Sequence, residues 1–554
     1  MKGLSSHCTN SLTARPRVAA ISAAALISAV ITFSSTDTAG VCSAQPRGFM
    51  LPGQTSRGQT TSAQASPEDA LIDRGPFFLI ERRNLWNTGW NINGLRADSV
   101  TVSFAELHGN FTSGGFHDTY QAARSWSAGA EARTITHLEK FSMYGSFSFD
   151  SFSGKEMCGS MSARPGYYPV DVLEFTPGAK TMQTYSFAGG ITADLSRRWR
   201  LGGKISYTGA NYTKRKDLRH ANWLLDMTVS PSVMYHNDDF AAGLSYIFGK
   251  NSESIDAEER GISSTAYYAF LDKGLMYGAY EVWEGSGIHL SESGINGFPI
   301  KEIIHGAAAQ IQWRGLYAEV SYLHGLGAAG EKQTIWFTFP EHRAGAKIGA
   351  AFGKEGNRHL IRLNLLWARQ FNNENVIGQE TQNGVTVTRI YGSNRILGRE
   401  RFCFAPDYEW NSPGASVRFG AEISGLFRLS SQMYPYLFSR NDVVSRIWAS
   451  GSVKIKAFDI KAGLAFSSGN SVEKSTTLDE DMVTGELPDR LQAWHDMQSE
   501  YLTAPRLDAA LALRFNFLKG LYVEASASYV RGFNLNFLYG PDRWSESLKF
   551  GYAF

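Results

Sequence analysis

The sequence is poor in charge and in cysteine. Charged residues make up 19% of its 554 positions, whereas a soluble protein of this size usually carries roughly a quarter. The 54 basic residues nearly balance the 52 acidic ones, so no global field attracts nucleic acid and no nucleic-acid partner is predicted. No CxxC motif or ligand-spaced Cys/His cluster occurs among the 4 cysteines. We therefore predict neither a metal site nor another cofactor.

Long hydrophobic runs are also missing beyond the N-terminal region. Together with the mean hydropathy of −0.24, this absence argues against a helical membrane protein. Aromatic residues nevertheless reach 13%, and glycine numbers 55. A transmembrane β-barrel reconciles these values, because only alternate residues of each strand face lipid and the average hydropathy stays modest.

The N-terminal region has the pattern of an export signal. Arg15 and Arg17 precede the apolar run VAAISAAALISAVITF, and the motif VCSAQ places a cleavage site after Ala44. We predict a signal peptide over residues 1–44, with an uncleaved membrane anchor as the alternative.

Three segments are predicted after the signal. Residues 45–73 are rich in Gly, Ser, Thr and Gln and are predicted to be a disordered leader. Residues 74–98 mix aromatic and charged residues without a clean period, so this pre-barrel segment lies just before the barrel or inside it. Residues 99–554 are predicted to form the barrel. Export permits a disulfide between Cys158 and Cys403, but two separate thiols are the favoured interpretation.

Segments that alternate apolar and polar residues recur from about residue 99 to the end of the chain. A period of two predicts β-strands with one apolar and one polar face. Clear examples occupy residues 141–150, 199–207, 361–367, 415–423 and 511–517.

The connections between these segments are short and long in turn, which is the pattern of outer-membrane barrels. We therefore predict an all-β, closed, transmembrane antiparallel β-barrel of about 18–20 strands, within an outer range of roughly 14–20, with long extracellular loops. Residues 371–445 are the hardest to divide into strands. Short turns are predicted at residues 237–239, 314–315, 458–459 and 518–520, and long loops at residues 158–180, 211–221, 372–383 and 470–505.

The last strand carries the sharpest local signal. In SESLKFGYAF, Leu548, Phe550, Tyr552 and Phe554 share one face and Lys549 lies on the other. A lysine that faces lipid near mid-membrane costs roughly 2–4 kcal/mol, so Lys549 is predicted to point inward. The residues Phe550, Tyr552 and Phe554 are similar to the C-terminal signal that the barrel-assembly machinery recognises, and we predict that machinery as a partner.

Three further segments carry a family resemblance. They are RNLWNTGWNINGLR (residues 83–96), SARPGYYPVDVLEF (162–175) and GGKISYTGANYTKRKDLRHAN (202–222). Together they resemble a Bacteroidota-type family of outer-membrane β-barrels of unknown function, over about residues 74–554. The resemblance implies the fold and a location in the cell outer membrane, and it transfers no catalytic residue.

A membrane-embedded hydrolase is the enzymatic alternative. His495 and Asp496 are adjacent in a long loop and could form an acid/base pair. The acidic pattern of residues 477–501 is better explained by a solvated surface helix. His117 and Asp118 are adjacent as well, which shows how easily such pairs arise by chance. The sequence also has no G-x-S-x-G motif, which would mark a serine nucleophile. We therefore predict no catalytic residue and no enzyme.

Loop residues suggest possible surface partners. The basic loop KRKDLRH (residues 214–220) could contact anionic lipopolysaccharide or an acidic partner, although an ordinary charged loop beside lipid head groups is favoured. Tyr167, Tyr168 and Trp494 could stack on sugars, but packing roles are favoured. A TonB-dependent plug domain is disfavoured because only residues 45–97 precede the first strand.

Strand parity directs many charged side chains into the lumen, with a basic excess. Such a lining would mildly favour anionic solutes, whereas paired charges and inward loops would close the bore; both interpretations stay open. The predicted lumen-lining residues include Arg200, Lys204, Arg362, Arg418, Glu422, Lys454, Arg514 and Glu524.

The favoured function is a plug-less porin-like or substrate-selective transport channel of the outer membrane. The alternative is a non-transport surface barrel that presents loops to a partner lipoprotein, a glycan or a host component. Predicted partners are outer-membrane lipid and lipopolysaccharide, the barrel-assembly machinery, and either a lipoprotein or a small solute.

Overall fold

The computed structural model describes residues 84–97, 101–258, 269–274, 280–283, 295–330, 334–354, 356–382, 385–431, 437–475 and 489–554. All of them belong to one compact unit, Gly40–Phe554. The predicted signal peptide and leader fall outside the described residues and stay predictions. No helix among the described ranges is long and apolar enough to cross a bilayer.

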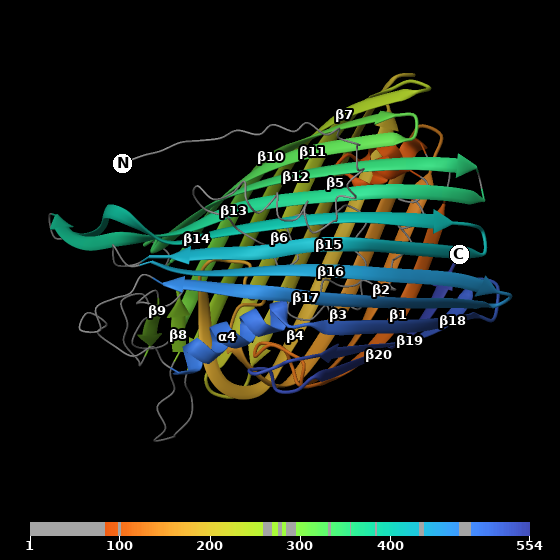
Figure 1. The fold of residues 1–554 in the computed structure, drawn as a ribbon. Coiled ribbons are helices and arrows are strands. Elements are labelled where there is room, and N and C mark those ends of the chain that lie inside the picture. The colour runs from red at the N-terminus through yellow and green to blue at the C-terminus, as the bar shows by residue number, and fades with distance from the viewer. Residues whose placement is uncertain are drawn as a thin grey trace, which may run out of the picture. The chain divides into compact units, whose positions relative to one another are not determined.

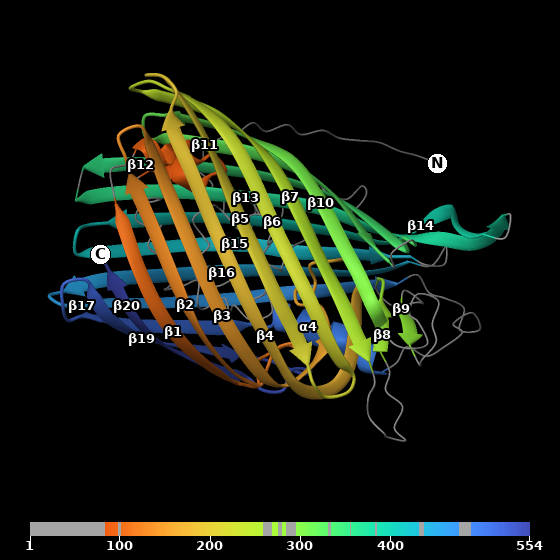
Figure 2. The ribbon, with the colours of Figure 1, turned by 180° about the vertical axis from the view of Figure 1, so that it is seen from behind.

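Eighteen strands form one closed antiparallel barrel, as predicted (Figure 1). Strands that follow one another in the chain pair side by side, as Figure 2 shows for β1 to β7. β7 pairs with β10, and β20 closes the ring by pairing with β1. The barrel strands are β1 (Val102–Gly114), β2 (Arg124–His137), β3 (Phe141–Ser160), β4 (Asp171–Asp194), β5 (Trp199–Lys214), β6 (Arg219–His236), β7 (Phe240–Glu258), β10 (Ile295–Trp313), β11 (Leu316–Ala329), β12 (Phe337–Lys354), β13 (Asn357–Gln382), β14 (Val385–Asn411), β15 (Ala415–Ser430), β16 (Phe438–Ile455), β17 (Phe458–Ser475), β18 (Arg506–Asn516), β19 (Leu521–Gly532) and β20 (Asp542–Ala553).

Two short strands stand outside this ring. β8 (Ala269–Asp272) and β9 (Tyr280–Trp283) form a hairpin in the connection between β7 and β10. β8 pairs with the beginning of β4, where Asp171 lies opposite Asp272. The hairpin therefore covers part of one rim.

The alternation of the sequence becomes two faces of the barrel wall. Large apolar side chains such as Leu107, Ile205 and Phe419 point outward and are about half exposed. In β20, Leu548, Phe550, Tyr552 and Phe554 are outward and exposed, whereas Lys549 is buried inside, 3.3 Å from Glu524. Each of the eighteen strands hydrogen-bonds to a neighbour on both sides, so the ring itself is closed, while β13 and β14 extend beyond it as a hairpin.

The two rims differ in the length of their connections. One rim has only tight turns, including the predicted ones at residues 237–239, 314–315 and 518–520. The fourth predicted turn, at 458–459, is wrong by two residues: the turn is Lys456-Ala457, with Lys456 at φ 53°, because Ile455 still pairs with Phe458.

The long-loop rim departs further from the prediction, because strands extend into the predicted loops. Residues 211–221 form a tight connection of which only 215–218 lie outside strands. Residues 372–382 continue β13, and residues 158–180 are mostly strand around a loop at 161–170. We call residues 161–170 the inner loop.

The predicted helix in the last long loop is present as α4 (Asp489–Thr503), but its assignment as a solvated surface helix is wrong. Trp494 and His495 are buried, and Ser499 donates to Asp442 on the inner face of β16 at 2.8 Å. One side of α4 thus packs against the inside of the wall.

Candidate functional site

Residues 84–97, which we call the luminal segment, lie inside the barrel. They include two short 3-10 helices, η1 (Leu85–Thr88) and η2 (Ile92–Ala97). Trp86 is fully buried and contacts Tyr317 of β11 edge to face at 6.2 Å. Of the two positions predicted for the pre-barrel segment, its described part takes the one inside the barrel.

Charged side chains of the wall hold this segment through its backbone. The Trp90 amide donates to Glu319 Oε2 at 2.8 Å, and Lys347 Nζ donates to the Thr88 carbonyl at 2.8 Å. Lys204 Nζ donates to the Gly89 carbonyl at 3.3 Å and lies 5.1 Å from the centre of the Trp90 ring. Polar side chains of the wall therefore pair with backbone groups of the luminal segment that are not paired within a helix or a sheet.

The unusual composition of the luminal segment has a structural cause. Asn91 Nδ2 donates to the Val233 carbonyl at 2.9 Å, and Thr192 Oγ1 donates to Asn93 Oδ1 at 2.6 Å. Gly89 is required for the close approach, because a Cβ at this position would overlap the side chains of Gln310, Glu319 and Tyr317. Asn91, Asn93 and Gly89 do not recur with the period of a strand or a helix, because the groups that they contact lie on strands remote in sequence.

The inner loop also lies inside the barrel, and a chamber separates it from the luminal segment. Arg164 Nη1 donates to Asp226 Oδ2 of β6 at 2.6 Å, and the guanidinium lies 4.3 Å from the centre of the Tyr167 ring. The Tyr167 hydroxyl donates to Glu302 Oε2 of β10 at 2.7 Å. Tyr167 and Tyr168 are both buried and contact each other edge to face, so they pack the loop into the lumen.

The inner loop is also bound from the far wall. Arg399 of β14 donates from Nη2 to the Tyr167 carbonyl at 2.6 Å and from Nη1 to the Gly166 carbonyl at 2.8 Å. Arg343 Nη2 of β12 donates to the Tyr167 hydroxyl at 3.4 Å. Polar contacts from β6, β10, β12 and β14 therefore hold the loop across the lumen.

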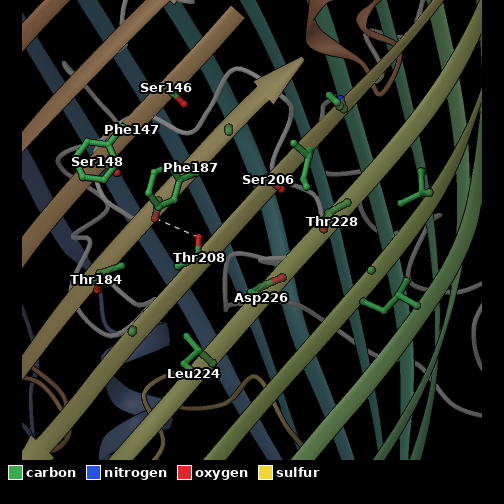
Figure 3. Close-up of a pocket in the computed structure, with 18 of the residues that line it drawn as sticks. Ser146, Phe147, Ser148, Thr184, Phe187, Ser206, Thr208, Leu224, Asp226 and Thr228 are labelled. Carbon is green, nitrogen blue, oxygen red and sulfur yellow. Dashed lines mark hydrogen bonds between the residues drawn. The ribbon is translucent and has the colours of Figure 1, made fainter. Parts of the chain in front are cut away.

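Between the luminal segment and the inner loop lies a chamber of about 100 Å³. By the measure of roughly 10–15 Å³ per water molecule, it has room for several waters or one small solute. Trp90 lines one end and Arg164 and Tyr167 the other, while Ile247, Ile304 and Leu323 form an apolar side. The opposite side presents seven hydroxyl-bearing residues of β3 to β6: Ser146, Ser148, Thr184, Ser186, Ser206, Thr208 and Thr228 (Figure 3).

These hydroxyl groups are only partly engaged with one another. Ser186 Oγ and Thr208 Oγ1 lie 3.2 Å apart. Thr184 Oγ1 is buried and has no hydrogen-bond partner among the described residues. A buried hydroxyl without a partner is costly, so Thr184 is a natural contact for a polar group in the chamber.

Five charged residues line the chamber; four of them are held in ion pairs, whereas Lys204 Nζ donates to the Gly89 carbonyl. Glu131 contacts Arg133, and Asp226 contacts Arg164. Arg343 bridges Glu302 and Glu341, at 3.2 Å and 2.6 Å. The chamber therefore offers hydroxyl groups and apolar surface, with its nearest charges largely compensated.

Of the predicted lumen-lining residues, the structure brings only Lys204 to the chamber. Arg362 and Arg418 share Asp407 at 2.7 and 2.8 Å. Arg514 contacts Glu524 at 2.8 Å. Arg200 contacts Asp194 near the short-turn rim, Glu422 lies opposite Arg446, and Lys454 is exposed beside the turn at 456–457.

Several of the chamber residues come from the segments that carry the family resemblance. Trp90 belongs to RNLWNTGWNINGLR, Arg164 and Tyr167 to SARPGYYPVDVLEF, and Thr208 to the GGKISYTGANY segment. Thr184 and Ser186 could have been found from the alternation TYSF, in which Tyr185 and Phe187 face outward.

The candidate acid/base pairs do not form in the structure. Asp496 Oδ1 accepts from Arg440 at 2.6 Å, and neither ring nitrogen of His495 has a partner among the described residues. Burial, reinforced by Arg428 and Arg440, lowers the pKa of His495 well below its ordinary value. His117 contacts the backbone oxygen of Asp118 and not its carboxylate.

Other chemistry was sought in the same part of the chain. Within the described residues, no group of three or more His, Cys, Asp or Glu side chains is arranged to hold a metal ion. Cys158 and Cys403 are free thiols, which confirms the prediction of two separate cysteines. The basic loop is largely engaged with the protein, since Lys214 contacts Glu174 at 2.6 Å.

The fold and its contents define a closed β-barrel with an internal chamber. The chain belongs to a family of unknown function, DUF6850, whose model matches residues 94–554. No curated protein matches the chain. The family assignment agrees with the predicted resemblance, whereas the bacterial group stays a prediction.

Solved structures with a similar course of the chain are large barrels. The ferric preacinetobactin receptor BauA of Acinetobacter baumannii is 6% identical, with 81% of this chain and 80% of that one covered and a TM-score of 0.38. A mutant of the ferric enterobactin receptor PfeA of Pseudomonas aeruginosa is 10% identical, with 82% and 81% covered and a TM-score of 0.37. The FrpB iron transporter of Neisseria meningitidis is 10% identical, with 82% of each chain covered and a TM-score of 0.36. At these values the similarity carries no argument about function.

Proposed function

We propose that this chain is an outer-membrane transport barrel that binds small, uncharged, hydroxylated solutes in its lumen chamber. The observation that carries the proposal is the hydroxyl-lined chamber between the luminal segment and the inner loop. Hydroxyl groups both donate and accept, so they match the hydroxyls of a polyol or a small sugar. The apolar side and the Trp90 ring match the less polar face of such a solute.

The membrane placement rests on the wall of the barrel. Only α-helices and closed β-barrels can span a bilayer, because their backbone N–H and C=O groups are paired within the protein. The ring of strands in this chain is such a closed barrel. Many outward side chains are apolar at about half exposure, as at Leu107, Val320 and Leu464, while charged wall residues such as Glu524 and Lys549 point inward and are buried. A soluble barrel has no reason to expose such a surface.

Transport requires that both short segments move. The luminal segment and the inner loop both line the chamber inside the lumen, and each is held by a few hydrogen bonds and ion pairs. We therefore propose a gated, substrate-selective channel and not a permanently open pore. The anion preference predicted from parity is the competing outcome of the solute test, because the charges that line the chamber are paired except for Lys204.

The test is solute uptake into proteoliposomes that contain the folded barrel. A small sugar alcohol should enter faster than an acid or an amine of the same size. T184V/T208V removes two chamber hydroxyls, each about 1 kcal/mol, so half-saturation should rise roughly thirtyfold. T181V, on the outward face of the same strand, is the matched control. No uptake of any solute after verified insertion would refute the proposal.

One observation favours the alternative of a surface barrel that presents a partner-binding loop. β13 and β14 stay paired to Gln382 and Val385, whereas β12 pairs with β13 only as far as Glu374. The freestanding hairpin projects beyond the rim (Figure 1) and exposes Val387 and Tyr391. A photo-crosslinker at Tyr391 on intact cells should then capture a stoichiometric partner, whereas one at Lys519, on the opposite rim, should not.

A further inference from the structure

The outer wall carries a row of histidines at one level of neighbouring strands. His305 of β10 lies opposite His324 of β11, which lies opposite His342 of β12. His342 in turn lies opposite Arg369 of β13. These four side chains share the outward face, and neighbouring strands are about 4.8 Å apart, so the row spans roughly 15 Å.

Tyrosines orient two of these imidazoles. The Tyr246 hydroxyl and His305 Nδ1 are 2.6 Å apart, and the Tyr322 hydroxyl and His342 Nδ1 are 2.7 Å apart. When the tyrosine donates to Nδ1, Nε2 bears the proton and is free to donate to an acceptor outside the wall. His324 stacks on His342, with ring centres 4.7 Å apart.

One end of the row lies at the upper edge of the apolar band. On β13 the outward residues between His359, near the short-turn rim, and Arg369 are apolar: Ile361, Leu363, Leu365 and Trp367. Ten residues of a strand tilted by about 40° rise roughly 25 Å, which is the height of the apolar band of an outer-membrane barrel. The Arg369 end of the row therefore falls where the head groups of the outer leaflet begin, and the tilt of the strands places the His305 end nearer the short-turn rim.

A groove and two lysines adjoin the row. Lys301 and Lys250 are exposed on the outward faces of β10 and β7, and Lys250 lies opposite Ile303, one outward position above His305. A groove of about 640 Å³ on the wall of β4 to β10 is lined by Phe187, Trp223 and Lys301 among others. An aromatic groove that ends at a lysine is suited to an apolar chain that carries an anionic head.

We propose that this face binds a phosphorylated, acylated lipid of the outer leaflet, with lipid A of lipopolysaccharide as the occupant. Lys301, Lys250 and the histidine row would bind the phosphate groups, and the groove beside Trp223 would hold an acyl chain. Charge complementarity favours a phosphate, because Glu400, beside Arg369, is the one acid at the level of the row within the described strands β10 to β14. The proposal rests on the membrane placement but not on transport.

The test is native mass spectrometry of the folded full-length barrel in detergent with purified lipid A. K301Q/H305Q should weaken binding at least tenfold. K354Q/H359Q removes the same two residue types at the opposite rim, where His359 Nδ1 also lies 2.7 Å from a hydroxyl, that of Tyr408, and should bind as wild type does. W223A should also weaken binding, because it opens the groove. Heat-dependent migration on a gel verifies that each variant is folded.

Dephosphorylated lipid A separates a phosphate site from simple hydrophobic adhesion. It should bind the wild-type barrel at least tenfold more weakly than lipid A does. Equal binding of the two lipids, or equal losses in K301Q/H305Q and K354Q/H359Q, would overturn the proposal. Because Lys301 and His305 face away from the lumen, K301Q/H305Q should keep wild-type solute uptake; a barrel that transports solute without binding lipid A would refute this inference alone.

Discussion

Arg164 holds the inner loop in the lumen, and its removal should expose the chamber. R164A removes the 2.6 Å ion pair with Asp226, a 3.3 Å hydrogen bond to the Tyr168 hydroxyl and the contact with the Tyr167 ring. Breaking a buried ion pair costs about 3–5 kcal/mol. The Asp226 side chain keeps 29% of its exposure, so water compensates part of the loss and the lower end, about 3 kcal/mol, applies.

A loss of about 3 kcal/mol corresponds to a rise of roughly a hundredfold in the fraction of molecules whose loop has left the lumen. The assay introduces T184C in the chamber, after Cys158 and Cys403 are replaced by alanine, and adds a membrane-impermeant maleimide to intact cells. If labelling follows loop opening, its rate should rise roughly a hundredfold in R164A. R215A removes an exposed arginine from a neighbouring loop and should leave the rate unchanged. A rate in R164A within threefold of the parent, in a folded barrel, would refute the role assigned to Arg164.

Three further predictions test other parts of the structure. G89A should overpack the contact of the luminal segment with Gln310, Tyr317 and Glu319 and lower the free energy of unfolding by about 1–3 kcal/mol, measured as a lower temperature at which the folded gel band disappears. Burial raises the pKa of Asp171 to about 7, and burial together with Asp171 raises that of Asp272 to about 8. Pairing of β8 with β4 is therefore favoured at low pH and weakens as pH rises through 7–8. Trypsin should cut wild type after Lys273 faster at pH 9 than at pH 6, and this ratio of rates should be larger in wild type than in D272N. V320R, outward at mid-band, should cost about 2–4 kcal/mol of folding stability in lipid vesicles in urea titrations, and a neutral effect there would contradict the membrane placement.

Much of the wall was predictable because strand parity is a local property. Trp199, Leu201 and Ile205 had to share a face, and a charged neighbour such as Lys204 decided which face points inward. The stretch over residues 371–445 was hard to divide, yet ERFCFAPDYEWN contains the signal. Phe402, Phe404, Tyr408 and Trp410 alternate with Asp407 and Glu409, which are inward partners of Arg362.

The contents of the lumen were not predictable from local pattern. The Trp90 amide finds Glu319, 229 residues away, and Arg399 finds the carbonyl of Tyr167, 232 residues away. Such contacts depend on which strands face one another across the barrel, and parity does not encode that. Glu302 and Glu341 also face inward, where they pair with Arg343 and offset part of the basic excess predicted for the lumen.

The seam between β1 and β20 ties the completion of the sheet to the arrival of the last strand of the ring. Phe104 pairs with Ala553, and the amide of Phe554 donates to the Ser103 carbonyl at 2.9 Å. Until residues 542–553 arrive, both margins of the growing sheet present unpaired amides and carbonyls that would recruit other chains. A truncation that removes β20 should therefore yield aggregates and not a smaller ring.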